Sequence, residues 1–80
     1  MSNTPHELHE EFPQDADRIH ALKTSDAHFA KLVEGYHEVN RAVHRMETNI
    51  EAVADAVLED FKKQRLELKD KIASALAKLA

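Results

Sequence analysis

The sequence predicts an all-α protein built on long amphipathic helices of the coiled-coil type, and two observations lead to this fold class. Glycine occurs once and proline twice among 80 residues, whereas the strong helix formers Ala, Leu, Glu, Lys and Arg are plentiful. Apolar residues also recur at alternating spacings of three and four, which is the pattern of a heptad seam. A chain of this length makes one domain at most, with a thin core.

We expect residues 1–13 to form a flexible acidic arm. Two prolines interrupt this stretch and no apolar period is sustained in it, so it predicts at most one helical turn. A helix is then predicted to begin near Gln14, because proline suits a first helical turn and acidic residues follow it. At residues 24–26, Thr-Ser-Asp competes for backbone hydrogen bonds, which leaves open both a break with re-capping and a continuous helix.

Two seams of apolar residues follow one another along the rest of the chain. The first runs from Phe29 to Val57 and the second from Leu58 to Leu79, displaced by one residue. Such a reset of phase predicts either a turn that begins a second helix or a skip within one continuous helix. The residues that we expect to form the packing and interaction face are Leu22, Phe29, Leu32, Val33, Tyr36, Val39, Val43, Met46, Leu58, Phe61, Arg65, Leu66, Leu68, Ile72 and Leu76.

The position of a turn is weakly marked. Thr48, Asn49 and Asp55 are able to end or cap a helix, but neither glycine nor proline accompanies them. Residues 51–57 have good helical composition and stay in the phase of the first seam, which favours a helix that runs on. Local physical chemistry alone therefore slightly prefers a continuous helix.

Two stretches of the chain resemble the YdcH-like family of small bacterial proteins of unknown function. They are residues 22–29, LKTSDAHF, and residues 62–72, KKQRLELKDKI, and segments 36–40 and 44–47 add to the likeness. The resemblance extends over roughly residues 12–79. It implies a two-helix antiparallel hairpin, but it implies no function.

With this resemblance, the predicted architecture of residues 14–80 is an antiparallel coiled-coil hairpin. Its helices are expected at about residues 14–47 and 56–79, with the connection at about 48–55. The alternative is one long interrupted helix in an intermolecular coiled coil. The chain departs from the family pattern in having Thr-Asn-Ile-Glu at residues 48–51, where members often carry glycine, and in its longer acidic arm.

The composition and the motifs of the sequence argue against several kinds of functional site. The chain has no cysteine, which excludes disulfides, thiolate metal sites and cysteine nucleophiles. No apolar run approaches a signal-peptide core or a membrane span, so we expect a cytoplasmic protein with no membrane partner. Neither a Gly-rich phosphate loop nor a serine elbow is present, and two thin helices cannot enclose an ordinary ligand pocket. We therefore expect no enzyme, no cofactor and no small-molecule substrate.

Six histidines invite a metal or pH-sensor interpretation, but their spacing argues against a shared ion. No two of them lie four residues apart. Within the predicted long helices the closest pair is His37 and His44, seven residues apart, which is about 10 Å along the helix axis. We expect solvated or interfacial side chains and no metal. The histidines are His6, His9, His20, His28, His37 and His44.

The second predicted helix carries a basic segment at residues 62–71. A nucleic-acid accessory binder is the alternative function that this segment suggests, although interleaved acids and a net charge of −4 argue against a nucleic-acid partner. We expect the Arg65 stem to pack in the seam while its guanidinium reaches a carboxylate on the facing helix, which would set register. Tyr36 is expected in the core with its hydroxyl at the edge, and Gly35 to permit close helix approach.

The leading functional hypothesis is a non-enzymatic helical module for protein–protein interaction or self-association. The hypothesis rests on two apolar seams in a sequence that carries no catalytic or ligand-binding motif. Val33, Leu66 and Leu76 lie off the strict seams, so we expect them on outer flanks that a second hairpin or a larger protein partner would cover. A homo-oligomer or a larger protein partner is therefore expected.

Overall fold

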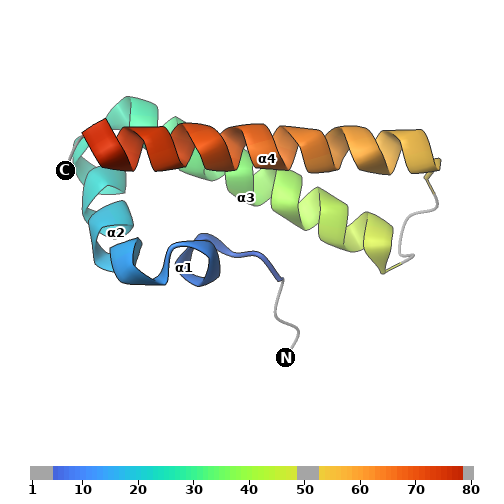
Figure 1. Ribbon diagram of the computed structural model, residues 1–80, viewed down its shortest axis with the longest axis horizontal. Coiled ribbons are helices and arrows are strands. Elements are labelled where there is room, and N and C mark those ends of the chain that lie inside the picture. Colours follow the sequence, from blue (N-terminus) through green and yellow to red (C-terminus); the bar gives the residue numbers. More distant parts are fainter. Residues whose placement is uncertain (1–4, 49–52, 79–80) are drawn as a thin grey trace.

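The computed structural model describes residues 5–48 and 53–78, and within them the chain is helical (Figure 1). The elements in order are α1 (Leu8–Glu11), the 3-10 helix η1 (Pro13–Asp15), α2 (Ala16–Ser25), α3 (Ala27–Glu47) and α4 (Asp55–Lys78). These described residues contain no strand. The predicted all-α class is confirmed.

Helices α3 and α4 run in opposite directions and pack against each other, so the predicted hairpin is confirmed (Figure 1). Residues 53 and 54 are not helical, which ends the alternative of one helix continuing into α4. The rest of the predicted connection falls partly on residues 49–52, which lie outside the described residues. Toward that end the two helices diverge, and Val53 and Val57 of the first predicted seam are exposed.

The prediction of a single helix over residues 14–47 is wrong, because the chain breaks at Asp26. This residue is extended, with φ −132° and ψ 109°, and its carboxylate accepts a hydrogen bond from the Phe29 backbone N–H at 3.0 Å. A side-chain acceptor at this position satisfies one of the free N–H groups of a helix start. Of the two alternatives that the Thr-Ser-Asp run left open, the break with re-capping is therefore the one observed.

The break lets α2 fold back toward the hairpin instead of extending it (Figure 1). Arg18 of α2 ties the two together, since its Nη2 donates to the Leu76 carbonyl at 2.6 Å and its Nη1 to Asp15 at 3.1 Å. The Leu76 carbonyl belongs to the last turn of α4, where carbonyl groups have no partner within the helix. An arginine from a different helix thus caps α4.

One apolar core joins all four α-helices. Its buried members are Leu8, Ile19, Phe29, Val33, Tyr36, Ile72 and Leu76, and Phe12, Leu22, Leu32, Leu68 and Ala75 pack partly buried against them. The expectation that residues 1–13 form a flexible arm is wrong for its described part, because Leu8 is 3% exposed within this core. Leu8 and Phe12 are four residues apart, which places both apolar side chains on the same side of one helical turn.

The outer flanks predicted for self-association are also wrong at two of three positions. Val33 and Leu76 are buried in the core, because the chain's own α1 and α2 cover the flank on which they lie. Leu66 is 58% exposed, as expected of a residue off the seam. The chain thus covers by itself much of the surface that a second hairpin was expected to cover.

Gly35 faces the side chain of Leu68 across the hairpin. A Cβ atom built on Gly35 would stand 3.6 Å from Leu68 Cδ2, which is ordinary van der Waals contact. Glycine is therefore not required for the approach of α4 at this point, contrary to the expectation from sequence.

Candidate protein-interaction groove

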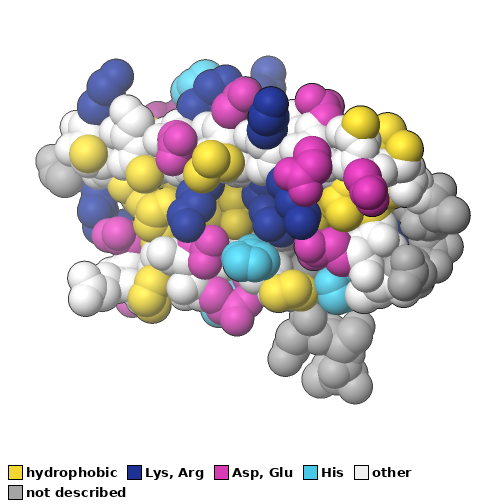
Figure 2. Space-filling model, turned by 45° about the vertical axis from the view of Figure 1, so that its right-hand side comes forward, with side chains coloured by type: hydrophobic (Ala, Val, Ile, Leu, Met, Phe, Trp, Pro, Cys, Tyr) yellow, Lys and Arg dark blue, Asp and Glu magenta, His cyan; other side chains and the backbone are white. Residues whose placement is uncertain are grey.

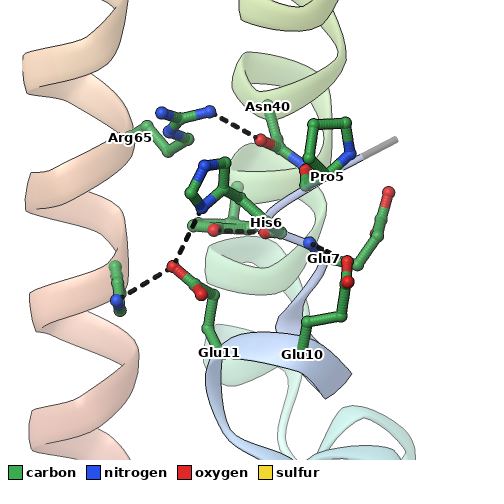
Figure 3. Close-up of polar contacts among 9 residues, drawn as sticks. Pro5, His6, Glu7, Glu10, Glu11, Asn40 and Arg65 are labelled. Atoms are coloured by element: carbon green, nitrogen blue, oxygen red, sulfur yellow. Dashed lines mark hydrogen bonds and ion pairs between the residues drawn. The ribbon is translucent and has the colours of Figure 1, made fainter. Parts of the chain in front are cut away.

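Residues 5–12, here called the N-terminal segment, lie against the hairpin and are held there by its side chains (Figure 3). The Tyr36 hydroxyl donates a hydrogen bond to the His6 carbonyl at 2.6 Å. One turn further along α3, Asn40 Nδ2 donates to the Pro5 carbonyl at 2.9 Å. Two side chains of the hairpin thus bind the main chain of another segment, which is a contact that does not depend on that segment's side chains at these positions.

The backbone conformation of His6 in this arrangement is unfavourable. Its φ is 62°, in the left-handed region, which costs a residue with a Cβ atom roughly 1–2 kcal/mol. The two adjacent carbonyls that accept bonds from α3 belong to this residue and to the one before it. Downstream, Glu7 N donates to Glu10 Oε1 at 3.3 Å, a side-chain cap at the start of α1.

Asn40 is the polar centre of the contact between the two long helices and the N-terminal segment. It is 1% exposed, and while its amide nitrogen serves Pro5, its Oδ1 accepts a hydrogen bond from Arg65 Nη1 at 2.9 Å (Figure 3). No described buried side-chain polar atom lacks a partner. Arg65 therefore reaches across to α3 as predicted, but to an amide and not to the expected carboxylate.

Glu11 joins the segment to α4. Its Oε1 accepts from Lys69 Nζ at 3.0 Å and lies 3.4 Å from His6 Nδ1. The hydrogen bond from Lys69 lowers the pKa of Glu11, against the opposing effect of partial burial, and His6 adds to the lowering. The carboxylate is thus held in its charged form by a cation on a different helix.

Tyr36 is the most deeply buried of these groups, with no exposed surface. Burial raises the pKa of Tyr36 to about 12, and the carboxylates of Glu11, Glu7 and Glu10 add to this while Arg65 opposes it. The sequence placed its hydroxyl at the edge of the core. The structure places it inside, because the N-terminal segment covers the position and supplies an acceptor.

We call the surface formed by Tyr36, Asn40, Lys62, Arg65 and Lys69 the hairpin groove. A hollow of about 160 Å³ lies along it, bordered on the other side by His6 and Glu11 and at its rim by Leu66. Figure 2 shows Lys and Arg side chains gathered along the middle of this face, with Asp and Glu side chains directly beside them. The groove thus combines hydrogen-bond donors for main chain with a cationic wall.

The basic segment predicted at residues 62–71 is largely engaged by the chain itself. Lys62 pairs with Glu47 of α3 at 3.2 Å, and Lys69 and Arg65 make the contacts given above. Glu59, Lys63, Glu67 and Lys71 follow one another at helical spacings of four residues, but they form no ion pair with one another in the described part of α4. The cations of α4 are therefore used between elements and not along one helical face.

The fifteen residues of the predicted face are placed as follows. Phe29, Val33, Tyr36, Val43, Ile72 and Leu76 are buried, Leu66 is exposed, and the other eight, Leu22, Leu32, Val39, Met46, Leu58, Phe61, Arg65 and Leu68, are half-buried. The groove brings together Tyr36 and Arg65 from this set. Sequence reasoning missed Leu8, Glu11 and Asn40, although the spacing of Leu8 to Phe12 was an available signal.

The described residues also set limits on metal binding and on membrane crossing. They contain no group of three or more His, Asp or Glu side chains arranged to hold a metal ion. None of their helices combines the length and apolar character that crossing a membrane requires. Of the histidines, His37 lies with its Nδ1 3.2 Å from Glu7 Oε2, a contact that is an ion pair only when the ring is protonated.

Comparison with known proteins identifies the hairpin. The family model described as "Protein of unknown function (DUF465)" matches residues 29–76, from the first turn of α3 to the last turns of α4. No curated protein and no solved structure matches the chain. The YdcH-like proteins belong to the matched family, so the resemblance seen in the sequence is confirmed over the hairpin, while residues 12–28 lie outside the match. The chain belongs to this family of proteins of unknown function.

Proposed function

We propose that this protein is a non-enzymatic protein-interaction module, and that the hairpin groove is its binding surface for a segment of polypeptide. The observation behind the proposal is that the groove already binds one. Tyr36 and Asn40 donate to consecutive main-chain carbonyls of the N-terminal segment, at 2.6 and 2.9 Å. Hydrogen bonds to the main chain are a recurring source of affinity for peptide segments.

The proposal moves the interaction surface away from the flank suggested by the sequence. Val33 and Leu76 are buried under α1 and α2, so they are unable to meet a partner while the chain is folded. Leu66 is the large apolar side chain with the greatest exposure among the described residues, and it borders the groove. Leu66 thus adds exposed apolar area beside Tyr36 and Arg65, whose residue types are enriched in interfaces.

No contact of the described residues favours the nucleic-acid alternative. Binding of phosphates requires cations that are free to release their counterions. In this chain Lys62 and Lys69 are paired with carboxylates, and Arg65 donates to a buried amide. Acidic residues also alternate with the remaining lysines of α4.

Photo-crosslinking in cells tests the proposal. A photoreactive residue replaces Leu66 in the full chain, and a matched variant carries it at Gln64, which is also exposed but lies about 200° around α4. We expect a discrete protein adduct from position 66 that position 64 does not give. The captured protein, once purified, should bind the unlabelled chain, and Lys69→Glu should weaken that binding. Identical adducts from both positions would contradict the proposal.

A further inference from the structure

The occupant of the hairpin groove indicates which kind of partner the groove fits. Three of its contacts define a pattern: two main-chain carbonyls accept hydrogen bonds from α3, a leucine is buried, and a carboxylate three residues later pairs with Lys69 of α4. These features belong to residues 5–12, which carry three glutamates and no lysine or arginine. The complementary wall of the groove carries three cationic side chains from α4.

Resting on the proposed function, we infer that the hairpin groove accepts in trans an acidic polypeptide segment with a leucine three residues before a glutamate. The chain's own N-terminal segment competes for the same place. The partner's chemistry is thus the chemistry of the segment that occupies the groove: two main-chain carbonyls that accept hydrogen bonds from α3, an apolar anchor and a carboxylate in register with Lys69.

Three observations favour exchange of the occupant. It contributes only four residues of α-helix, which have no independent stability. His6 is held in the left-handed region, an unfavourable conformation that a glycine in a partner would adopt without cost. A hollow of about 240 Å³ lies beside Leu8, so the packing around this anchor is incomplete. It is bordered by Ala16, Ile19 and Val33 and by the polar side chains of His9, His20, Lys23 and His37.

The family match also separates the hairpin from the N-terminal segment. It covers α3 and α4, which supply all five groove residues, and it leaves out the segment that fills the groove. The groove residues of this chain thus lie inside the matched region, and the occupant comes from outside it. A tethered occupant has an effective concentration in the millimolar range, so it masks the groove against weaker partners.

A defined acidic peptide tests this inference on the full chain. The probe is a fluorescein-labelled peptide with the sequence of residues 2–16, and its anisotropy is followed with the unchanged chain and with Leu8→Asp, whose buried carboxylate should expel the segment. We expect the peptide to bind Leu8→Asp at least about tenfold more tightly than the unchanged chain. In the Leu8→Asp background, Lys69→Glu should weaken binding, and a peptide with lysine in place of Glu11 should restore it.

A second measurement does not depend on how Leu8→Asp folds. The chain has no cysteine, so His9→Cys, on the exposed side of α1, accepts a unique spin label. Unlabelled peptide should mobilise this label, whereas a peptide with aspartate in place of Leu8 should not. Absence of both binding and mobilisation overturns the inference, while the crosslinking at position 66 judges the proposed function separately. Equal affinity of the unchanged chain and Leu8→Asp overturns competition by the N-terminal segment.

Discussion

Two elements cover the same side of the α3–α4 hairpin, but different contacts hold them. α2 buries Ile19 in the core and caps the end of α4 through Arg18. The N-terminal segment also buries one aliphatic side chain, Leu8, and packs Phe12 partly buried against the core. Its other contacts with the hairpin are polar. The first element is ten residues of helix, and the second has one helical turn.

This difference separates α2, an integral part of the fold, from the N-terminal segment, which occupies the groove of an already formed hairpin. A hydrogen bond exchanged with water contributes only about 1 kcal/mol net, so polar contacts fix where the N-terminal segment lies more than how firmly it is held. α2 adds the break at Asp26 and the cap on α4, which are features of the fold itself. The N-terminal segment is the element that is able to leave while the hairpin stays folded.

The largest expected effect contrasts Val33 and Leu66, which the sequence placed alike on outer flanks. Val33→Asp places a carboxylate in the core and should cost at least about 3 kcal/mol of unfolding free energy, enough to unfold a small domain. Leu66→Asp should change it by less than about 0.5 kcal/mol, because that side chain is exposed. Urea unfolding followed by circular dichroism measures both. Similar costs for the two variants would contradict the assignment of Val33 to the core.

The next contrast compares the two covering elements directly. Ile19→Ala should destabilise the fold by about 2–4 kcal/mol, as expected for a buried aliphatic side chain. Leu8→Ala should cost less, because release of the N-terminal segment limits the loss to the free energy of docking that segment. The same urea experiment ranks them. If Leu8→Ala cost as much as Ile19→Ala, the segment would be an integral part of the fold.

Asn40→Ala should cost about 1–2 kcal/mol, since Arg65 and the Pro5 carbonyl both lose a buried partner. Gln64→Ala is the matched control, because its amide also makes a side-chain hydrogen bond, to Asp60, but does so in solvent. That control should stay within about 0.5 kcal/mol of the unchanged chain. Thermal unfolding of the two variants side by side measures the difference, and equal melting temperatures would count against Asn40 as a buried anchor.

The smallest expected effect is a gain. Gly35→Ala should stabilise the protein by about 0.5–1 kcal/mol, because alanine has the higher helix propensity and Leu68 leaves room for its Cβ. A rise of a few degrees in melting temperature would show this. A fall would mean that α4 lies closer to α3 at this point than the contact with Leu68 indicates.

The heptad seams predicted the hairpin helices well, because apolar spacing on a long helix depends only on local sequence. The seams end where the helices diverge, so they wrongly include Val53 and Val57. The N-terminal segment escaped prediction for a physical reason. Its one turn of helix carries no period, and its order comes from contacts with residues more than 25 positions away, such as Tyr36 and Lys69.

Only some residues of the hairpin groove could be predicted from the sequence. Arg65 stood out as a charged residue on a seam, and Tyr36 as an aromatic in the core. Asn40 did not, because an amide beside a seam is ordinary until a third element approaches and makes it buried. The break at Asp26 was one of two open alternatives, since capping residues mark a possible helix start without deciding whether the chain uses it.

The burial of Tyr36 links the groove to pH. Its folded pKa lies above the ordinary tyrosine value of about 10, so the neutral hydroxyl is the form that the fold prefers. The stability from this preference is therefore complete below pH about 10 and is lost as the pH rises toward about 12. Glu11 has the opposite sign. Its lowered pKa gives stability that is complete above pH about 4.3 and is lost as the pH falls through the lowered value.

Titration of Tyr36 tests most directly whether the N-terminal segment fills the groove. The chain has one tyrosine and no tryptophan, so phenolate absorbance reports this residue alone. We predict a midpoint near pH 12 for the unchanged chain and a midpoint moved toward about 10 in Leu8→Asp, with circular dichroism to check that the helices of this variant stay folded. A midpoint near 10 in the unchanged chain, or the same high value in both proteins, would contradict the account.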